Sequence, residues 1–79
     1  MRVLYFAQAR LATGRTEELV VSSKPMTEEA LWKLLIRKYP SLLALHTSCR
    51  IAKNGTFLNP NQQLDPRDEV AVLPPVSGG

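Results

Sequence analysis

The chain has 79 residues, 44% of them apolar, and a formal net charge of +3. This length suits one small domain with a single core, and the apolar share argues against global disorder. No apolar run is long enough to span a membrane. The ten basic residues form no run longer than two, whereas a nucleic-acid footprint is denser and usually interleaved with aromatic residues. We therefore expect no nucleic acid and no membrane as a partner, and only a mild bias towards acidic partners.

The start of the chain and its cysteine content both predict a cytosolic location. Residues 3–6 already read as a strand, without the charged lead, long apolar core and cleavage site of a signal peptide. Cys49 is the only cysteine, so no internal disulfide can form, which fits a reducing compartment.

The first half of the chain predicts two strands followed by a helix. Residues 2–8 are apolar on both faces, as in a central strand, and residues 17–22 predict a second strand. A turn or loop is expected at residues 9–16. Thr27 is a suitable N-cap for a helix that stops at Pro40.

The predicted helix has one apolar stripe. Leu31, Leu34 and Leu35 share a face, with Ala30 alongside. Trp32 falls off this stripe, so we expect it to pack at the flank of the helix rather than to bind a ligand.

The second half predicts a hairpin and a final strand. Asn54-Gly55 between short apolar runs is a strong hairpin signal. Leu64 is an isolated apolar residue that we expect to plug the core. Residues 65–68 have the chemistry of a turn, and residues 69–73 predict the last strand.

These elements predict an α+β fold in the order β-β-α-β-β-β. One main helix covering one face of a mixed sheet is the economical two-layer arrangement. Because the first and last strands are apolar on both faces, we place them next to each other at the centre, hence parallel. The prediction is a ubiquitin-like β-grasp domain at residues 1–73, followed by a flexible tail at residues 74–79.

The tail presents a terminal carboxylate on a short tether. Its prolines favour an extended course, and its glycines lack a Cβ, so the backbone can enter a narrow channel. Six residues extend at most roughly 20 Å. We predict that the carboxylate of Gly79 is the reacting group and that the remaining tail residues insert into a partner. These are Pro74, Pro75, Val76, Ser77 and Gly78.

The whole chain resembles the small, sulfur-carrier subunits of molybdopterin synthase, the MoaD family. The segments that carry the resemblance are Val3-Leu4-Tyr5-Phe6-Ala7-Gln8-Ala9-Arg10, Ala52-Lys53-Asn54-Gly55 and, most specifically, Asp68-Glu69-Val70-Ala71 followed by Pro74-Pro75-Val76-Ser77-Gly78-Gly79. Arg50 and Lys53 depart from it, because they are more polar than we expect around that hairpin.

The resemblance implies a chemical cycle with several partners. A ubiquitin-activating-like adenylyltransferase, using ATP and magnesium, adenylates Gly79. Sulfur from a rhodanese-type or desulfurase-type donor then displaces AMP and leaves a thiocarboxylate. The tail enters the large catalytic subunit and gives its sulfur to a cyclic pyranopterin precursor, which becomes the molybdopterin dithiolene. The resemblance also favours a heterotetrameric synthase.

The chain itself shows no catalytic machinery. We find no general acid or base, no metal site and no glycine-rich phosphate loop, so we expect it to bind no cofactor or metal and to act as a co-substrate. Cys49 is interpreted as a small, partly buried, inert residue, and His46 as a loop histidine.

A partner-docking surface is predicted on the sheet face away from the helix. If Val70 and Val72 face the helix, Leu73 faces away. The residues expected on this open face are Phe6, Leu73, Phe57 and Leu4. Arg10, expected at the end of the first strand, is a weaker candidate. The alternative is that residues 41–49 cover these side chains.

Other functions remain open at this point. A related carrier for thiamine (thiazole) synthesis or tRNA thiolation shares the fold and the double glycine. A ubiquitin-like protein modifier, which forms isopeptide bonds with lysines, is a third possibility.

Overall fold

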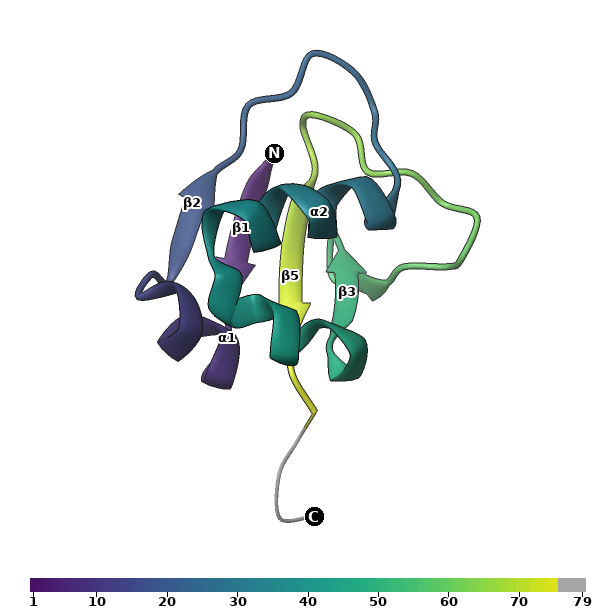
Figure 1. Ribbon diagram of the computed structural model, residues 1–79. Coiled ribbons are helices and arrows are strands. Elements are labelled where there is room, and N and C mark those ends of the chain that lie inside the picture. The colour runs from purple at the N-terminus through teal and green to yellow at the C-terminus, as the bar shows by residue number, and fades with distance from the viewer. Residues whose placement is uncertain (76–79) are drawn as a thin grey trace.

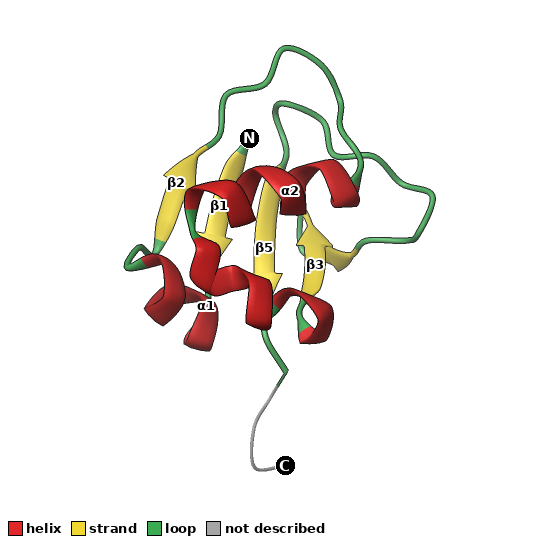
Figure 2. Cartoon of the chain, in the orientation of Figure 1, coloured by secondary structure: helices red, strands yellow, loops and turns green. Residues whose placement is uncertain are grey.

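A mixed five-stranded sheet, covered on one face by the helical segments, forms the domain (Figures 1 and 2). The computed structural model describes residues 1–75. The strands are β1 (Arg2–Tyr5), β2 (Glu17–Leu19), β3 (Arg50–Lys53), β4 (Thr56–Phe57) and β5 (Glu69–Leu73), and the helices are α1 (Ala7–Thr13), α2 (Glu28–Lys38) and the 3-10 helices η1 (Pro40–Ala44) and η2 (His46–Ser48). No helix in this part of the chain is both long and apolar enough to cross a membrane.

The first and last strands pair in parallel at the centre of the sheet, as predicted. The strand order is β2-β1-β5-β3-β4, and every pair except β1–β5 is antiparallel. The register of the central pair runs from Arg2 opposite Glu69 to Tyr5 opposite Val72. Val70 and Val72 are fully buried on the helix side. The last strand is therefore held on both edges before the chain leaves the sheet.

Helix α2 begins and ends where the sequence predicts. The Thr27 hydroxyl accepts a hydrogen bond from the Ala30 amide at 3.1 Å, which caps the first turn. The last helical residue is Lys38, and Pro40 opens η1. Leu31 and Leu35 are fully buried.

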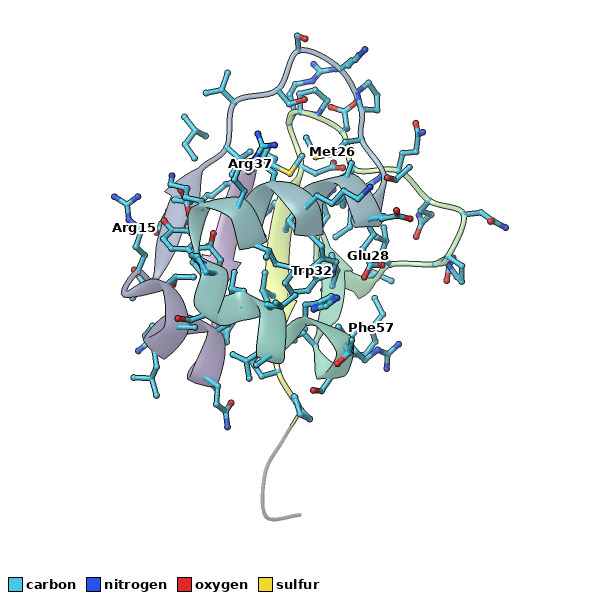
Figure 3. The ribbon with its side chains drawn as sticks, viewed as in Figure 1. Arg15, Met26, Glu28, Trp32, Arg37 and Phe57 are labelled. Atoms are coloured by element: carbon cyan, nitrogen blue, oxygen red, sulfur yellow. The ribbon has the colours of Figure 1, made fainter. Side chains whose placement is uncertain are left out.

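The predicted flank position of Trp32 is wrong. Trp32 is only 6% exposed and belongs to the core, whereas Leu34, predicted on the core stripe, is 38% exposed. The helix turns its 31–32–35 face to the sheet, and the Trp32 indole donates a hydrogen bond to Glu28 at 3.2 Å (Figure 3). This bond satisfies the one polar group of the indole, so the ring can be buried.

The predicted loop at residues 9–16 is also wrong, because helix α1 occupies most of it. β1 ends at Tyr5, three residues before the predicted end of the strand at residue 8. Gly14 ends the helix in the left-handed conformation at φ 72°, with its amide bonded to the Arg10 carbonyl. Arg10 consequently lies in this helix and not at the end of a strand.

The second predicted strand is shorter than residues 17–22. β2 ends at Leu19, although the Val20 amide still bonds to the Met1 carbonyl at 2.8 Å. Beyond that pair the chain leaves the edge of β1.

The second half of the chain follows the predictions. Asn54 and Gly55 have φ values of 51° and 86°, as a primed hairpin turn requires. The Asn54 side chain also donates to Asp68 at 3.0 Å and accepts from the Glu69 amide at 2.9 Å. The hairpin turn therefore fixes the start of β5 as well. Leu64 is fully buried, as expected.

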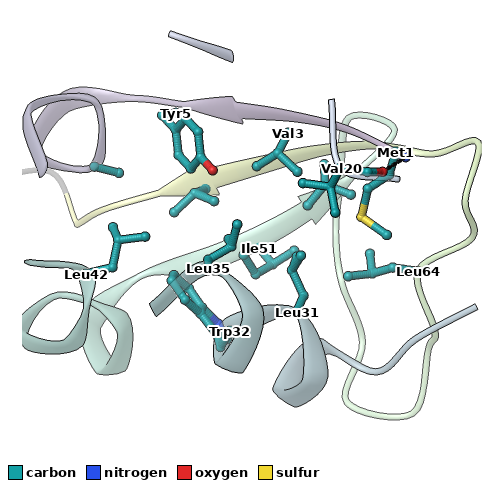
Figure 4. Packing of buried hydrophobic residues seen from close by; sticks show 13 residues of the cluster. Met1, Val3, Tyr5, Val20, Leu31, Trp32, Leu35, Leu42, Ile51 and Leu64 are labelled. Atoms are coloured by element: carbon teal, nitrogen blue, oxygen red, sulfur yellow. Dashed lines mark hydrogen bonds between the residues drawn. The ribbon is translucent and has the colours of Figure 1, made fainter. Parts of the chain in front are cut away.

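The core lies between the sheet and α2 (Figure 4). The buried apolar cluster contains Met1, Val3, Tyr5, Ala9, Val20, Leu31, Trp32, Leu35, Leu42, Ile51, Leu64, Val70 and Val72.

One carboxylate, Glu18 on β2, is buried at the edge of this core. Tyr5 donates a hydrogen bond to it at 2.6 Å, Lys38 of α2 donates another, and Arg15 lies 3.7 Å away. Burial acts to raise the pKa of Glu18, but the hydrogen bonds from Lys38 and Tyr5 outweigh it and hold the pKa below its usual value. Burial next to this carboxylate also raises the pKa of Tyr5.

Replacing Glu18 by Gln should destabilise the domain in a pH-dependent way. The amide keeps an acceptor for Tyr5 but leaves Lys38 without its counter-ion, so we expect a loss of about 2 kcal/mol near pH 7. A lowered folded-state pKa stabilises the fold above the unfolded pKa of roughly 4.3 and loses that contribution as the pH falls through the folded value. The difference from wild type in urea unfolding should therefore shrink below about pH 4. A pH-independent difference would contradict the charge pairing.

Candidate functional site

The base of the tail leaves the sheet from its central strand. β5 ends at Leu73, Pro74 is partly buried and Pro75 is exposed. In Figure 1 the chain leaves at the end of the sheet where α1 also lies. Other predicted tail residues, including the reacting residue, lie outside the described part of the chain: Val76, Ser77, Gly78 and Gly79.

The sheet face opposite α2 carries the predicted docking side chains in two neighbouring rows. Residues opposite each other in register point to the same face. The first row runs across four strands and comprises Phe57, Ala52, Ala71 and Leu4. The second row, next to the tail, pairs Arg50 with Leu73, and Phe6 follows β1 in extended conformation at the end of that row.

Phe6 and Phe57 stand out on this face because they are 40% and 49% exposed. Leu4 and Leu73 are partly buried between them. Of residues 41–49, Leu42 is fully buried in the core on the helix side, whereas Ser48 borders Phe57 and Leu73. The four apolar residues therefore lie on one open face, and their role in docking stays a prediction.

The other end of the same face is polar. The Arg2 guanidinium pairs with Glu17 at 2.7 Å and with Glu69 at 3.1 Å. The hydrogen bond that Arg2 donates to Glu17 raises the pKa of Arg2 and lowers the pKa of Glu17. The exposed aromatic side chains of this face, Phe6 and Phe57, lie at the end next to the tail, whereas the polar end carries Leu19, which lies opposite Arg2 and is 73% exposed.

Comparison with known proteins places this architecture in a family. The model of the ThiS family matches residues 3–79. The chain belongs to the ThiS family.

Curated relatives of this ThiS-family chain match over its full length. The molybdopterin synthase sulfur carrier subunit of Chlamydomonas reinhardtii is 33% identical over 100% of the chain and 98% of the relative. The protein of the same name from Homo sapiens is 32% identical over 100% of the chain and 93% of the relative.

Solved structures confirm the predicted β-grasp fold. A putative molybdopterin converting factor subunit 1 from Pyrococcus furiosus superposes with a TM-score of 0.82 at 24% identity, over 95% of each chain. The small archaeal modifier protein 1 of Methanosarcina acetivorans gives 0.75 at 29% identity, over 99% of this chain and 94% of that one. A chain of the complex of subunits 1 and 2 of the molybdopterin-converting factor from Helicobacter pylori gives 0.65 at 22% identity, over 99% and 96%.

A groove at the base of the tail is the feature of this ThiS-family chain that the sequence did not predict. It is lined by Ser48, Arg50, Phe57, Leu73, Pro74 and Pro75. The guanidinium carbon of Arg50 lies 3.8 Å from the centroid of the Phe57 ring. The sequence showed Arg50 only as an unexpectedly polar residue. The predicted hairpin could have indicated this contact, because its register places Arg50 and Phe57 on the same face of the sheet.

The remaining candidates lie apart from this groove. Arg10 lines a separate depression with Ala7, Gln8 and Leu11 on α1. Cys49 is partly buried, as predicted, and burial raises the pKa of its thiol. His46 lies in η2 and not in a loop, with Nδ1 2.8 Å from the Leu43 carbonyl oxygen. Among residues 1–75, no three histidine, cysteine or acidic side chains gather as a metal site.

Proposed function

We propose that this chain is the sulfur-carrier small subunit of a molybdopterin synthase and that the Gly79 carboxylate is its reacting group. The observation that carries the proposal is the full-length similarity to relatives of that name, together with a family match that runs through Gly79. The geometry supports it, because the central strand β5 leads directly into the predicted tail.

The proposed chemistry overcomes the low reactivity of a carboxylate. A carboxylate is a poor electrophile because its leaving group is oxide. An activating enzyme of the ubiquitin-activating type, using ATP and magnesium, attaches AMP to the carboxylate and releases pyrophosphate. The persulfide sulfur of a rhodanese-type or desulfurase-type donor then attacks the acyl carbon and displaces AMP, and a second thiol reduces the resulting acyl disulfide, forming a disulfide with the donor's sulfur. The product is a terminal thiocarboxylate, which is a nucleophile at neutral pH.

The large subunit is the proposed acceptor of this tail. The rigid domain docks through its open face, and the residues beyond Leu73 extend by at most roughly 20 Å into the active site. The catalytic side chains that pass the sulfur to the pyranopterin precursor belong to that subunit. The Helicobacter pylori complex supports such an arrangement for a protein of the same fold.

A protein-modifier function is the second candidate. The observation that favours it is the 29% identity to the small archaeal modifier protein 1 of Methanosarcina acetivorans. A modifier passes the same activated terminus to a lysine amine instead of converting it to a thiocarboxylate.

Changing the length of the tail should abolish sulfur transfer. Deleting Gly79, or adding one alanine after it, moves the reacting carbonyl by one residue and, in the second case, gives it a Cβ. In a synthase reconstituted with the large subunit, we expect molybdopterin formation to fall at least about a hundredfold, as misplacement of a reacting atom produces. Replacing the partly buried Cys49 by Ser is the control and should leave activity unchanged. Full activity of either length variant would refute the carrier mechanism.

Charges placed on the apolar half of the open face should prevent docking. Phe6→Asp or Leu73→Asp puts a carboxylate where we expect an apolar partner surface, so affinity for the large subunit should fall by roughly 3 kcal/mol or more. Calorimetric titration measures this loss, and circular dichroism tests that the isolated domain stays folded. Leu43→Asp is the matched control, because Leu43 is also exposed but lies in η1. Equal affinities for all variants would exclude this face as the docking surface.

A further inference from the structure

The geometry of Arg50 is that of a pre-positioned carboxylate receptor. Its guanidinium stacks on the Phe57 ring at 3.8 Å, well within the range of a cation–π contact. Stacking uses the flat face of the guanidinium and leaves its N–H donors free in the plane. A group held in this way loses little conformational entropy when it forms a bidentate pair with a carboxylate.

Arg50 has no such carboxylate within residues 1–75. No hydrogen bond or ion pair of its side chain is found there, although it is exposed. Arg2, the other arginine that strand register places on the open face, is already paired with Glu17 and Glu69. Of the two arginines on the open face, only Arg50, which lies beside the tail, has no partner in residues 1–75 for its side-chain N–H donors.

The position of Arg50 ties it to the route of the tail. It lies opposite Leu73 in the β3–β5 register and lines the groove that also contains Pro74 and Pro75. A partner that takes up the tail must approach this groove. Covering a guanidinium without supplying a counter-charge costs several kcal/mol. A partner adapted to this chain therefore gains affinity by presenting an acidic side chain here.

We propose that Arg50, oriented by Phe57, is a specificity-determining residue that binds an acidic side chain on the rim of the large subunit's tail channel. This inference rests on the proposed function and names the charge of the partner surface. An anionic membrane or a nucleic acid fits less well, because both are bound by clusters of basic residues, and this one stands beside an apolar surface. Arg50 acts on docking and not on the sulfur chemistry, since the proposed reacting group lies four residues beyond Pro75.

Affinity for the purified large subunit, measured by calorimetry at low and high salt, tests the proposal. We expect Arg50→Gln to raise Kd at least about tenfold and Arg50→Glu at least about a hundredfold at low salt. High salt should weaken wild-type binding and narrow these differences. Arg67→Glu changes the net charge equally but lies in the turn that precedes β5, so its Kd should change no more than about twofold. In steady-state assays with the thiocarboxylated chain, Arg50→Gln should raise KM and leave kcat unchanged.

A double-mutant cycle tests the role assigned to Phe57. Phe57→Leu keeps an apolar residue but removes the ring, so it should raise Kd severalfold in the wild type and much less in the Arg50→Gln background. Equal effects in both backgrounds would show that Phe57 does not act through Arg50 and would overturn the proposal in this form.

Three other outcomes would overturn the inference. Unchanged Kd in Arg50→Glu excludes an acidic contact, and an equal loss in Arg67→Glu indicates general electrostatic attraction only. The third is a change in the Arg50 Nε–H NMR signal when the carboxylate of Gly79 is converted to an amide, which would assign the receptor to the chain's own terminal carboxylate. Failure of the wild type to bind the large subunit would instead refute the proposed function, so the two failures are distinguishable.

Discussion

The parallel pairing of β1 and β5 is the constraint on which the rest of the structure depends. It places the last strand between β1 and β3, so both of its edges are hydrogen-bonded. Val70 and Val72 are fully buried on this strand, and each buried valine contributes about 1.5–3 kcal/mol. The tail therefore starts from one of the best-anchored points of the fold. A domain built in this way can dock as a rigid unit while the residues beyond Leu73 reach into a partner.

Successive side chains of β5 point alternately to the two faces of the sheet, one of which packs against the core while the other stays open. Val70 and Val72 face α2, whereas Ala71 and Leu73 belong to the open face. That face is itself divided, because the Arg2 ion pairs occupy the end far from the tail. Arg50, Phe57 and Leu73 thus line one groove together with Pro74 and Pro75. A partner that binds this surface therefore also contacts the first residues of the tail.

The sequence predicts correctly those elements that are marked by a local turn signal or by apolar residues on both faces of a strand. The paired central strands and the Asn54-Gly55 hairpin were predicted correctly, since both patterns are explicit in the residues. Helix α1 was missed because it has only seven residues and no side-chain N-cap, although its Ala-Gln-Ala-Arg-Leu-Ala run favours a helix. Trp32 was misplaced because its burial depends on a hydrogen bond to Glu28. The contact between Arg50 and its aromatic neighbour on β4 depends on strand register, which only the structure supplies.

The mass of the intact chain tests the central claim most directly. The chain is isolated from cells in which the gene for the proposed large subunit is deleted, so that the thiocarboxylated carrier accumulates. The account predicts a species in which one oxygen of the Gly79 carboxylate is replaced by sulfur, and its loss when the activating enzyme is deleted. Conjugates to lysines of other proteins, without any sulfur-containing species, would contradict the account and favour a protein modifier.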